Sequence, residues 1–321
     1  MLYVPGLLKC LDGRWLERSV RCIVERMKVE GRLDAVDAHF AYPDGVGCVR
    51  LAARLGVPVF ITVRGVEVDQ LARPCLRRQI VGALSAATGI VSVSHTLRDV
   101  LISAGVDGTR VRVIHNAIDR DLFRPGDRAA ARHRLARNSA EQLIVAVGNL
   151  VELKRHDVLI EAIARVRTSR PGVRLAIIGA GDAEPRYGSR LRRKITELGV
   201  ADAVELIGKV SPERVVDWLQ AADVFALATA REGCCNAVLE ALACGIPVVT
   251  TPAGDNAQFV RAGTNGYLVP IGDVAGFATA IDSALQHRDW DPKAIAASLT
   301  VGNWSAVGRK VLAFFEERLA A

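Results

Sequence analysis

Two glutamates, Glu232 and Glu240, stand eight positions apart in the segment AREGCCNAVLEALACGIPVV, residues 230–249. A carboxylate accepts two hydrogen bonds from a vicinal diol, so two carboxylates around one turn can hold two sugar rings with phosphate between them. Gly233 lets the backbone approach a ligand closely, and Asn236 is a favourable N-cap for a helix whose free N–H groups suit phosphate. On its own, the spacing is equally typical of an ordinary surface loop followed by a helix.

Further residue types capable of chemistry follow other apolar runs. Lys154 comes after such a run through Gly148, so its ammonium can reach a phosphate at the carboxyl edge of a sheet; a solvated loop lysine is the alternative. His39 ends another run, where a packed histidine is the alternative. The D-x-D triplets at 119–121 and 289–291 have the residue types that hold Mg²⁺, but neither follows a buried strand suitably, so we predict no metal.

Short β-branched runs alternate with helical periodicity along the whole chain, the pattern of parallel βαβ units. A helix over 15–27 is expected to place Trp15, Leu16, Val20, Ile23, Val24 and Met27 on one face. The glycines of Gly179-Ala180-Gly181 predict a tight turn facing a nucleotide, without the third glycine of G-x-G-x-x-G. Strands are predicted at 35–39, 58–63, 89–93, 111–114, 143–147, 174–178, 203–206, 224–228, 247–250 and 266–269.

The rhythm stops once and restarts, which predicts two domains in 321 residues. A polar, arginine-rich stretch after Gly126 interrupts the pattern, and its composition predicts a linker. We therefore predict an α/β protein with a first Rossmann-like domain at 1–130, a linker at 131–141, a doubly wound domain at 142–300, and a final helix within 301–321 that packs back on the first domain.

Composition excludes several classes of function. The net charge of +7 favours anionic partners, but aromatic residues make up only 5% and do not interleave with basic clusters, so no nucleic-acid partner is expected. The seven cysteines form no metal-binding spacing, and their odd number argues for reduced thiols that pack as small apolar groups. No apolar run is long enough for a membrane span, so we predict a cytoplasmic protein.

The segment EGCCNAVLEALACGIPVV resembles the EG-x-x-N-x-x-LEA-x-ACG-x-PVV signature of retaining glycosyltransferase family 4, which has the GT-B fold. Other motifs of that family occur in the family's order over nearly the whole chain. They are HFAYPDG (39–45), TVRG (62–65), VIHNAIDRDLFRP (113–125), GNLVELKRHDVLIEA (148–162), IIGAGD (177–182), LIGKV (206–210), AADVFAL (221–227) and NGYLVP (265–270).

The resemblance implies two Rossmann-like domains that face each other across a cleft, and it assigns roles to individual residues. Glu232 is expected to hold the hydroxyls of the donor sugar, Glu240 the ribose, and Lys154 the departing diphosphate, with His39 near the sugar. Transfer would need no protein nucleophile, metal or cofactor, because orientation and charge neutralisation carry it. Further substrate-binding positions implied are Gly233, Cys234, Cys235, Asn236, Asn149, Arg155, Gly208, Lys209, Arg64 and Gly65.

Two departures from the family pattern affect what is expected. Asn149 stands where many members have an arginine on the diphosphate, and Arg155, Arg231 and Arg64 are alternative sources of that charge. The strand and glycine loop with which members begin has no counterpart before residue 35, so we expect an incomplete first domain. A late start site or a shortened reading frame is our hypothesis for it.

The function that the resemblance implies is transfer of a sugar from a nucleotide-diphosphate sugar to a glycan, lipid-linked or small-molecule acceptor, in polysaccharide or glycolipid assembly. The alternative is a non-catalytic remnant that binds nucleotide sugar or pairs with another transferase; an epimerase ranks last, because no acid/base set is found. Arginines at 14, 18, 21 and 26 could contact an anionic membrane peripherally, although the interspersed Glu17 and Glu25 favour a solvated helix face.

Overall fold

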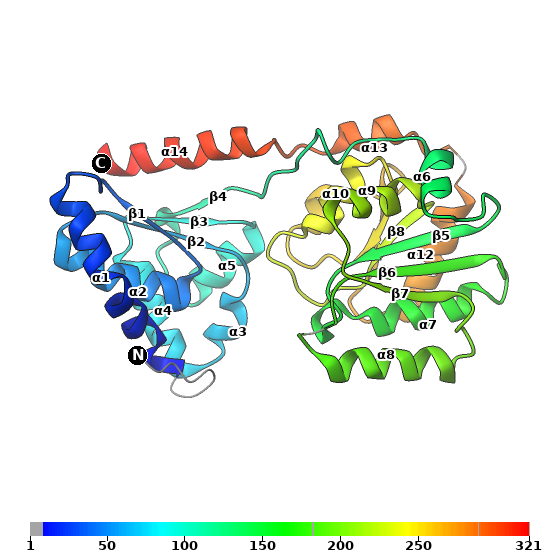
Figure 1. Cartoon of the computed structure of the whole chain (residues 1–321), viewed down its shortest axis with the longest axis horizontal. Helices are drawn as coiled ribbons and strands as arrows, with labels where there is room; N and C mark the ends of the chain where they lie inside the picture. The colour runs from blue at the N-terminus through cyan, green and yellow to red at the C-terminus, as the bar shows by residue number, and fades with distance from the viewer. Residues whose placement is uncertain (1–8, 182, 288, 321) are drawn as a thin grey trace. The chain divides into compact units, whose positions relative to one another are not determined.

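The computed structural model describes residues 9–181, 183–287 and 289–320. Two compact units divide these residues: unit 1 holds the described residues up to Asn116 and those from Trp304, and unit 2 holds Ala117–Asn303 (Figure 1). All ten strands predicted from the sequence are present, each within two residues of its expected ends. The predicted fold class, two Rossmann-like α/β units, is therefore confirmed.

Unit 1 is built on a parallel sheet of order β1-β2-β3-β4. Strand β2 is buried along its whole length, as expected of a strand covered on both faces. Its elements are η1 (Lys9–Leu11), α1 (Asp12–Val29), β1 (Val36–His39), η2 (Ala41–Gly45), α2 (Val46–Leu55), β2 (Val59–Val63), α3 (Glu67–Leu71), α4 (Pro74–Ala86), β3 (Gly89–Ser92), α5 (His95–Ser103), η3 (Gly108–Arg110), β4 (Val111–Val113) and α14 (Trp304–Ala320).

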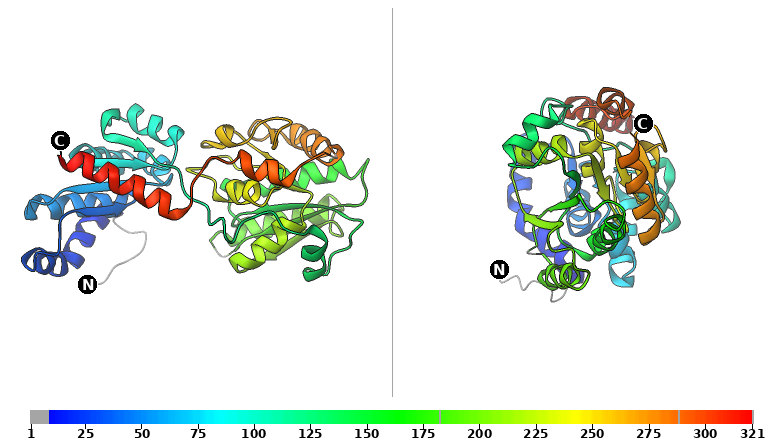
Figure 2. Two further views of the ribbon diagram at one scale, coloured as in Figure 1. Left: turned by 90° about the horizontal axis from the view of Figure 1, so that it is seen from above. Right: turned by 90° about the vertical axis from the view of Figure 1, so that its right-hand side faces the viewer.

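The last helix of the chain, α14, packs on the sheet of unit 1, as Figure 2 also shows. The ring of Phe315 stacks on Phe60 of β2 with centroids 3.8 Å apart, and Phe314 meets the same ring edge to face. Arg112 of β4 forms an ion pair with Glu317 at 2.9 Å. Aromatic packing on a buried strand therefore places α14 in unit 1.

Two expectations for unit 1 were wrong. Ile23 does not share the packed face of α1, because its side chain is 63% exposed; the buried positions of that helix are Gly13 and Glu17. The cysteines are not all reduced, because Cys10 and Cys75 form a disulfide. Periodicity alone could not assign the helix face, because three arginines of α1 and α2 make it favourable to bury Glu17, a charged residue that does not belong to the predicted apolar face.

Unit 2 is built on a parallel sheet of order β10-β9-β8-β5-β6-β7, a doubly wound arrangement with β5 and β8 at its centre. Helices cover both faces (Figure 1). Its elements are α6 (Arg128–Arg134), β5 (Gln142–Val147), η4 (Glu152–Lys154), α7 (His156–Val166), β6 (Val173–Ile178), α8 (Pro185–Glu197), β7 (Val204–Gly208), α9 (Pro212–Ala221), β8 (Val224–Leu227), α10 (Asn236–Ala243), β9 (Val248–Thr250), α11 (Asn256–Phe259), β10 (Gly266–Leu268), α12 (Val274–Gln286) and α13 (Pro292–Ser298).

The boundary between the units lies earlier than expected. Residues 117–130 belong to unit 2, and the stretch assigned to a linker, 131–141, begins inside α6. Buried Arg132 of α6 donates to the backbone oxygen of Ala221 and forms an ion pair with Asp223 at 2.7 Å. An arginine-rich composition suggested a solvated linker, whereas these arginines bind partners on α9 and the residues after it.

No helix among the described residues is long and apolar enough to cross a membrane.

Candidate active site

The centre of the unit 2 sheet is its topological switch point, where ligands of doubly wound sheets bind. Strands β5 and β8 are neighbours there, although about 80 residues of chain separate them. The helices that follow these two strands, α7 and α10, pack into separate core clusters, the arrangement expected at a switch point. Lys154 follows β5 and Glu232 follows β8, and both therefore lie at this edge.

Lys154 and Glu232 contact each other directly. The Lys154 Nζ donates to Glu232 Oε1 at 2.6 Å, and both side chains are largely buried. Burial by itself would lower the pKa of Lys154, but the Glu232 carboxylate outweighs it and holds that pKa above its ordinary value. An ammonium has three N–H donors. Lys154 is thus held as a cation with two donors left for an incoming diphosphate.

The turn after β5 packs tightly against the turn after β6. A Cβ added to Gly179 would overlap the carbonyl group of Gly148, so only glycine fits there. The Asn149 side-chain oxygen accepts the N–H of Ala180 at 3.2 Å, which ties the two turns together. Gly179 forms a bend after β6, without the hydrogen-bonded tight turn that was predicted at 179–181. Asn149 uses its side-chain oxygen for the contact to Ala180, while its amide N–H groups remain as donors.

His156, at the start of α7, contacts the turn after β5. Its Nε2 lies 3.2 Å from the backbone oxygens of both Gly148 and Asn149, so Nε2 carries the proton and donates to them. The ring is fully buried, and burial lowers the pKa of His156 to about 4. A neutral histidine therefore fixes the loop between β5 and Lys154.

The Glu232–Gly233 loop rests on the loop after β9. A Cβ on Gly254 would come within 2.8 Å of the Gly233 oxygen and 3.2 Å of the Glu232 Cβ, and Gly254 also has a φ of +59°. Asn236 was expected to be the N-cap of the next helix, which was wrong: Cys235 is the N-cap, and its side chain makes no capping hydrogen bond. The N–H groups of Val238 and Leu239 donate to the backbone oxygen of Cys235.

Glu240 lies in the second turn of α10 and is mostly buried. Among the described residues its carboxyl group has no hydrogen bond or ion pair. Burial raises the pKa of the Glu240 carboxyl to about 7. A carboxylate kept mostly out of water without a partner costs stability, and a sugar diol would satisfy it.

The other unit 2 positions that the resemblance implied surround this edge. Arg155 has a φ of 48° and its side chain lies on Asp157, while Gly208 ends β7 with a φ of 83° beside exposed Lys209. Cys234 is half-buried and Cys235 is buried, and burial raises the pKa of the Cys235 thiol well above its usual range.

In unit 1, His39 ends β1 and Arg64 follows the neighbouring strand β2. Arg64 Nη2 lies 3.0 Å from His39 Nδ1 and Nη1 donates to Asn116 Oδ1 at 3.4 Å, while His39 Nε2 lies 3.4 Å from the Asp37 carboxylate. A guanidinium can only donate, so His39 Nδ1 accepts and the proton sits on Nε2. Burial raises the pKa of Asp37.

Glu67 holds the loops that carry His39 and Arg64. Its carboxylate is fully buried and accepts three backbone N–H groups, those of Ala41 at 3.1 Å, Arg64 at 3.2 Å and Gly65 at 2.7 Å. Gly65 has a φ of 120°, a conformation that favours glycine. A single buried anion thus joins the ends of β1 and β2.

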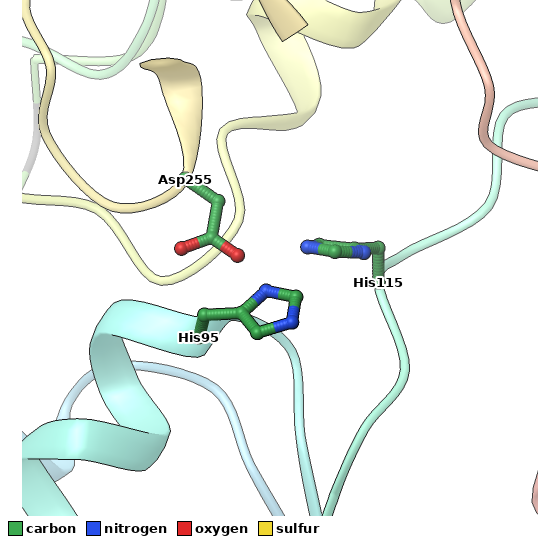
Figure 3. A group of neighbouring side chains, drawn as sticks. All are labelled: His95, His115 and Asp255. Carbon is green, nitrogen blue, oxygen red and sulfur yellow. The ribbon is translucent and has the colours of Figure 1, made fainter. Parts of the chain in front are cut away.

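A pair of histidines lies at the ends of the next two strands. His95 begins α5 after β3 and His115 follows β4, and their rings approach to 5.4 Å between centroids (Figure 3). Asp255, drawn in the same figure, belongs to unit 2. Sequence reasoning missed both histidines as well as Glu67 and His156. The signal available was their position just beyond a predicted strand or at the start of the following helix.

One aspartate of each D-x-D triplet accepts backbone N–H groups. Asp119 accepts the N–H groups of Asp121 and Leu122, and Asp291 caps α13 through the N–H of Lys293.

Comparison with known proteins identifies the family. The family described as Glycosyl transferases group 1 matches residues 141–287, and Glycosyltransferase Family 4 matches residues 3–122. The chain is 30% identical over 306 residues to D-inositol 3-phosphate glycosyltransferase 2 of Catenulispora acidiphila, covering 88% of this chain and 70% of that protein. It is 32% identical over 276 residues to the D-inositol 3-phosphate glycosyltransferase of Acidothermus cellulolyticus, covering 81% of this chain and 61% of that protein.

Solved structures give the same fold. HepE from Anabaena in complex with UDP-glucose superposes with a TM-score of 0.83 at 20% identity, covering 93% of this chain and 82% of that one. Sucrose-phosphate synthase from Thermosynechococcus elongatus gives a TM-score of 0.83 at 20% identity, covering 99% of this chain and 81% of that one. Given the parallel sheets of both units, the ordered motifs and these relatives, the chain belongs to glycosyltransferase family 4 and has the GT-B fold.

Proposed function

We propose that the chain transfers a sugar from a nucleotide-diphosphate sugar to a hydroxyl acceptor, with retention of configuration at the anomeric carbon. The observation that carries the proposal is the Lys154–Glu232 pair at the switch point between β5 and β8. A cation held there by a carboxylate suits a leaving diphosphate next to sugar hydroxyls. The same pairing favours an enzyme over a non-catalytic remnant, because simple retention of nucleotide does not need the cation and the carboxylate in contact.

Within unit 2 each side chain has a separate task. Lys154 neutralises negative charge that develops on the diphosphate, Glu232 binds donor-sugar hydroxyls, and Glu240 binds the ribose. The N-terminus of α10 adds a positive field near the phosphates. The role proposed for His39 rests on the resemblance alone.

The relatives support a choice of the first donor and acceptor to test. The complexes of HepE with UDP and UDP-glucose support a uridine-diphosphate sugar as the first donor to test. The name shared by the curated relatives supports a small phosphorylated polyol as the first acceptor, beside glycan and lipid-linked acceptors. We propose that no metal or cofactor takes part, so activity should survive a chelator. The predicted role in polysaccharide or glycolipid assembly and the predicted cytoplasmic location stay predictions.

The test is release of nucleoside diphosphate from a panel of UDP-, GDP- and ADP-sugars, with and without acceptor. One donor class should react, and Lys154→Met should slow release by roughly 100- to 1000-fold, the usual effect of losing one transition-state charge contact. Lys293→Met, at an exposed position of α13, is the control and should leave the rate unchanged. Equal rates for Lys154→Met and the unaltered chain would refute the assignment. The anomeric configuration of the product, read by proton NMR, tests retention.

A further inference from the structure

Unit 1 carries a strongly basic pocket that is lined by residues of α1 and α2. These two helices lie side by side (Figure 1). The pocket has a volume of about 530 Å³. Every residue that lines it is charged: Arg14, Glu17, Arg18, Arg21, Arg50 and Arg54.

One buried carboxylate organises three of these arginines. Glu17 is 4% exposed, and its two oxygens accept Arg21 at 3.2 Å, Arg50 at 2.8 Å and Arg54 at 3.1 Å. The hydrogen bond from Arg50 lowers the pKa of Glu17, so the carboxylate stays charged. Each guanidinium has five N–H donors, and one contact to Glu17 leaves most of them available. Guanidinium groups held in place beforehand lose less entropy when an anion binds.

Charge in the pocket is far from balanced. Five arginines face one glutamate, and Arg14 and Arg18 have no ion pair among the described residues. Packing of α1 against α2 explains why Glu17 attracts three arginines, but it does not explain two further arginines at the rim, whose like charges repel the others. A ligand with several negative charges would remove that repulsion.

A second hollow adjoins the basic pocket, shares Arg14 and Arg50 with it, and is also lined by Arg78, Gln79 and the Cys10–Cys75 disulfide. This second hollow has a volume of about 580 Å³ between α1, α2 and α4. The rest of its lining consists of small or apolar residues: Leu11, Val46, Val49, Gly82 and Ala83. A Cβ on Gly82 would meet no atom within 4 Å, so this hollow has open space.

We propose that the two hollows together bind an amphiphilic phosphate, with the phosphate in the arginine pocket and the apolar chain in the hollow beside Gly82. Arg14 and Arg50 line both hollows, so the two environments are contiguous. A lipid phosphate of a membrane surface has this chemistry, whereas nucleic acid and free phosphate have no apolar part. The site lies wholly in unit 1, and its occupancy does not depend on the proposed transfer reaction.

The experiment measures binding of the full chain to vesicles of phosphatidylcholine with and without 30 mol% phosphatidic acid, by flotation. We expect binding only to the acidic vesicles. The double variant Arg14→Glu/Arg18→Glu should bind roughly 20-fold or more weakly, since each basic residue near an anionic surface contributes severalfold. The control Arg309→Glu/Lys310→Glu makes the same charge change at exposed positions of α14 and should bind as the unaltered chain does.

A second variant tests the apolar half. Gly82→Leu fills the open hollow in an exposed helix position, where leucine also favours the helix. Titration with short-chain dihexanoyl phosphatidic acid and with inorganic phosphate should then show weaker binding of the lipid only. Two results would overturn the proposal: equal vesicle binding by both double variants, or equal affinity of the unaltered chain for inorganic phosphate and for the short-chain lipid.

Discussion

Glu240 offers the sharpest test, because the same carboxylate that is assigned to the ribose lowers the stability of the ligand-free chain. It is mostly buried in α10, and burial raises its pKa to about 7 from an ordinary value of 4.5. A raised carboxyl pKa means that the folded chain binds a proton more tightly than the unfolded chain does. The destabilisation therefore begins as pH rises above 4.5, grows up to about pH 7, and stays constant beyond it.

The magnitude follows from those two values. Each pKa unit corresponds to about 1.4 kcal/mol, so the full difference would destabilise unit 2 by about 3 kcal/mol above pH 7, and partial solvent access reduces this to about 2–3 kcal/mol. Glu240→Gln keeps the shape and removes the titration. We expect it to raise the free energy of unfolding by that amount at pH 8.5 and by nearly nothing at pH 4.

The assay is urea unfolding at both pH values, followed by the fluorescence of buried Trp218 in unit 2. Glu316→Gln, at an exposed position of α14, is the matched control and should change stability at neither pH. In parallel, calorimetric titration should show that Glu240→Gln binds nucleoside diphosphate roughly 10- to 100-fold more weakly at pH 8.5, through loss of hydrogen bonds to a charged group. Equal stabilisation at pH 4 and pH 8.5 would refute the electrostatic reasoning, and unchanged nucleotide affinity would refute the ribose assignment.

Three more predictions concern groups that shape the loops. The pKa of His156 is lowered, so unfolding free energy should fall by about 3 kcal/mol as pH drops from 6.5 to 4, and His156→Asn should flatten this dependence in urea titrations. Gly179→Ala should cost about 2–4 kcal/mol in thermal unfolding, whereas Gly172→Ala, where an added Cβ meets nothing, should change stability by under about 0.5 kcal/mol; equal losses would contradict the close-approach argument. Glu67→Ala leaves three backbone N–H groups without their acceptor and should destabilise unit 1 by about 3–5 kcal/mol, with a smaller loss for Glu67→Gln; an unaltered melting temperature in the alanine variant would contradict it.

Much of the fold was predictable because its signals are local. A parallel strand covered on both faces is a short run of β-branched residues, as in VFITV of β2, and such runs located all ten strands. Lys154 and Glu232 were likewise identified from their positions after such runs. Each depends only on a few neighbouring residues in the chain.

Tertiary structure decided which of these local features meet. That β5 lies next to β8 follows from the sheet order, and only this adjacency brings Lys154 within 2.6 Å of Glu232. The burial of two glutamates could not be predicted from the sequence for the same reason. Glu17 has arginine partners on α2, and Glu67 has backbone partners after β1. A sequence shows that a residue is a glutamate, but the free energy of burying it depends on donors supplied by distant segments, and only folding brings those donors into place.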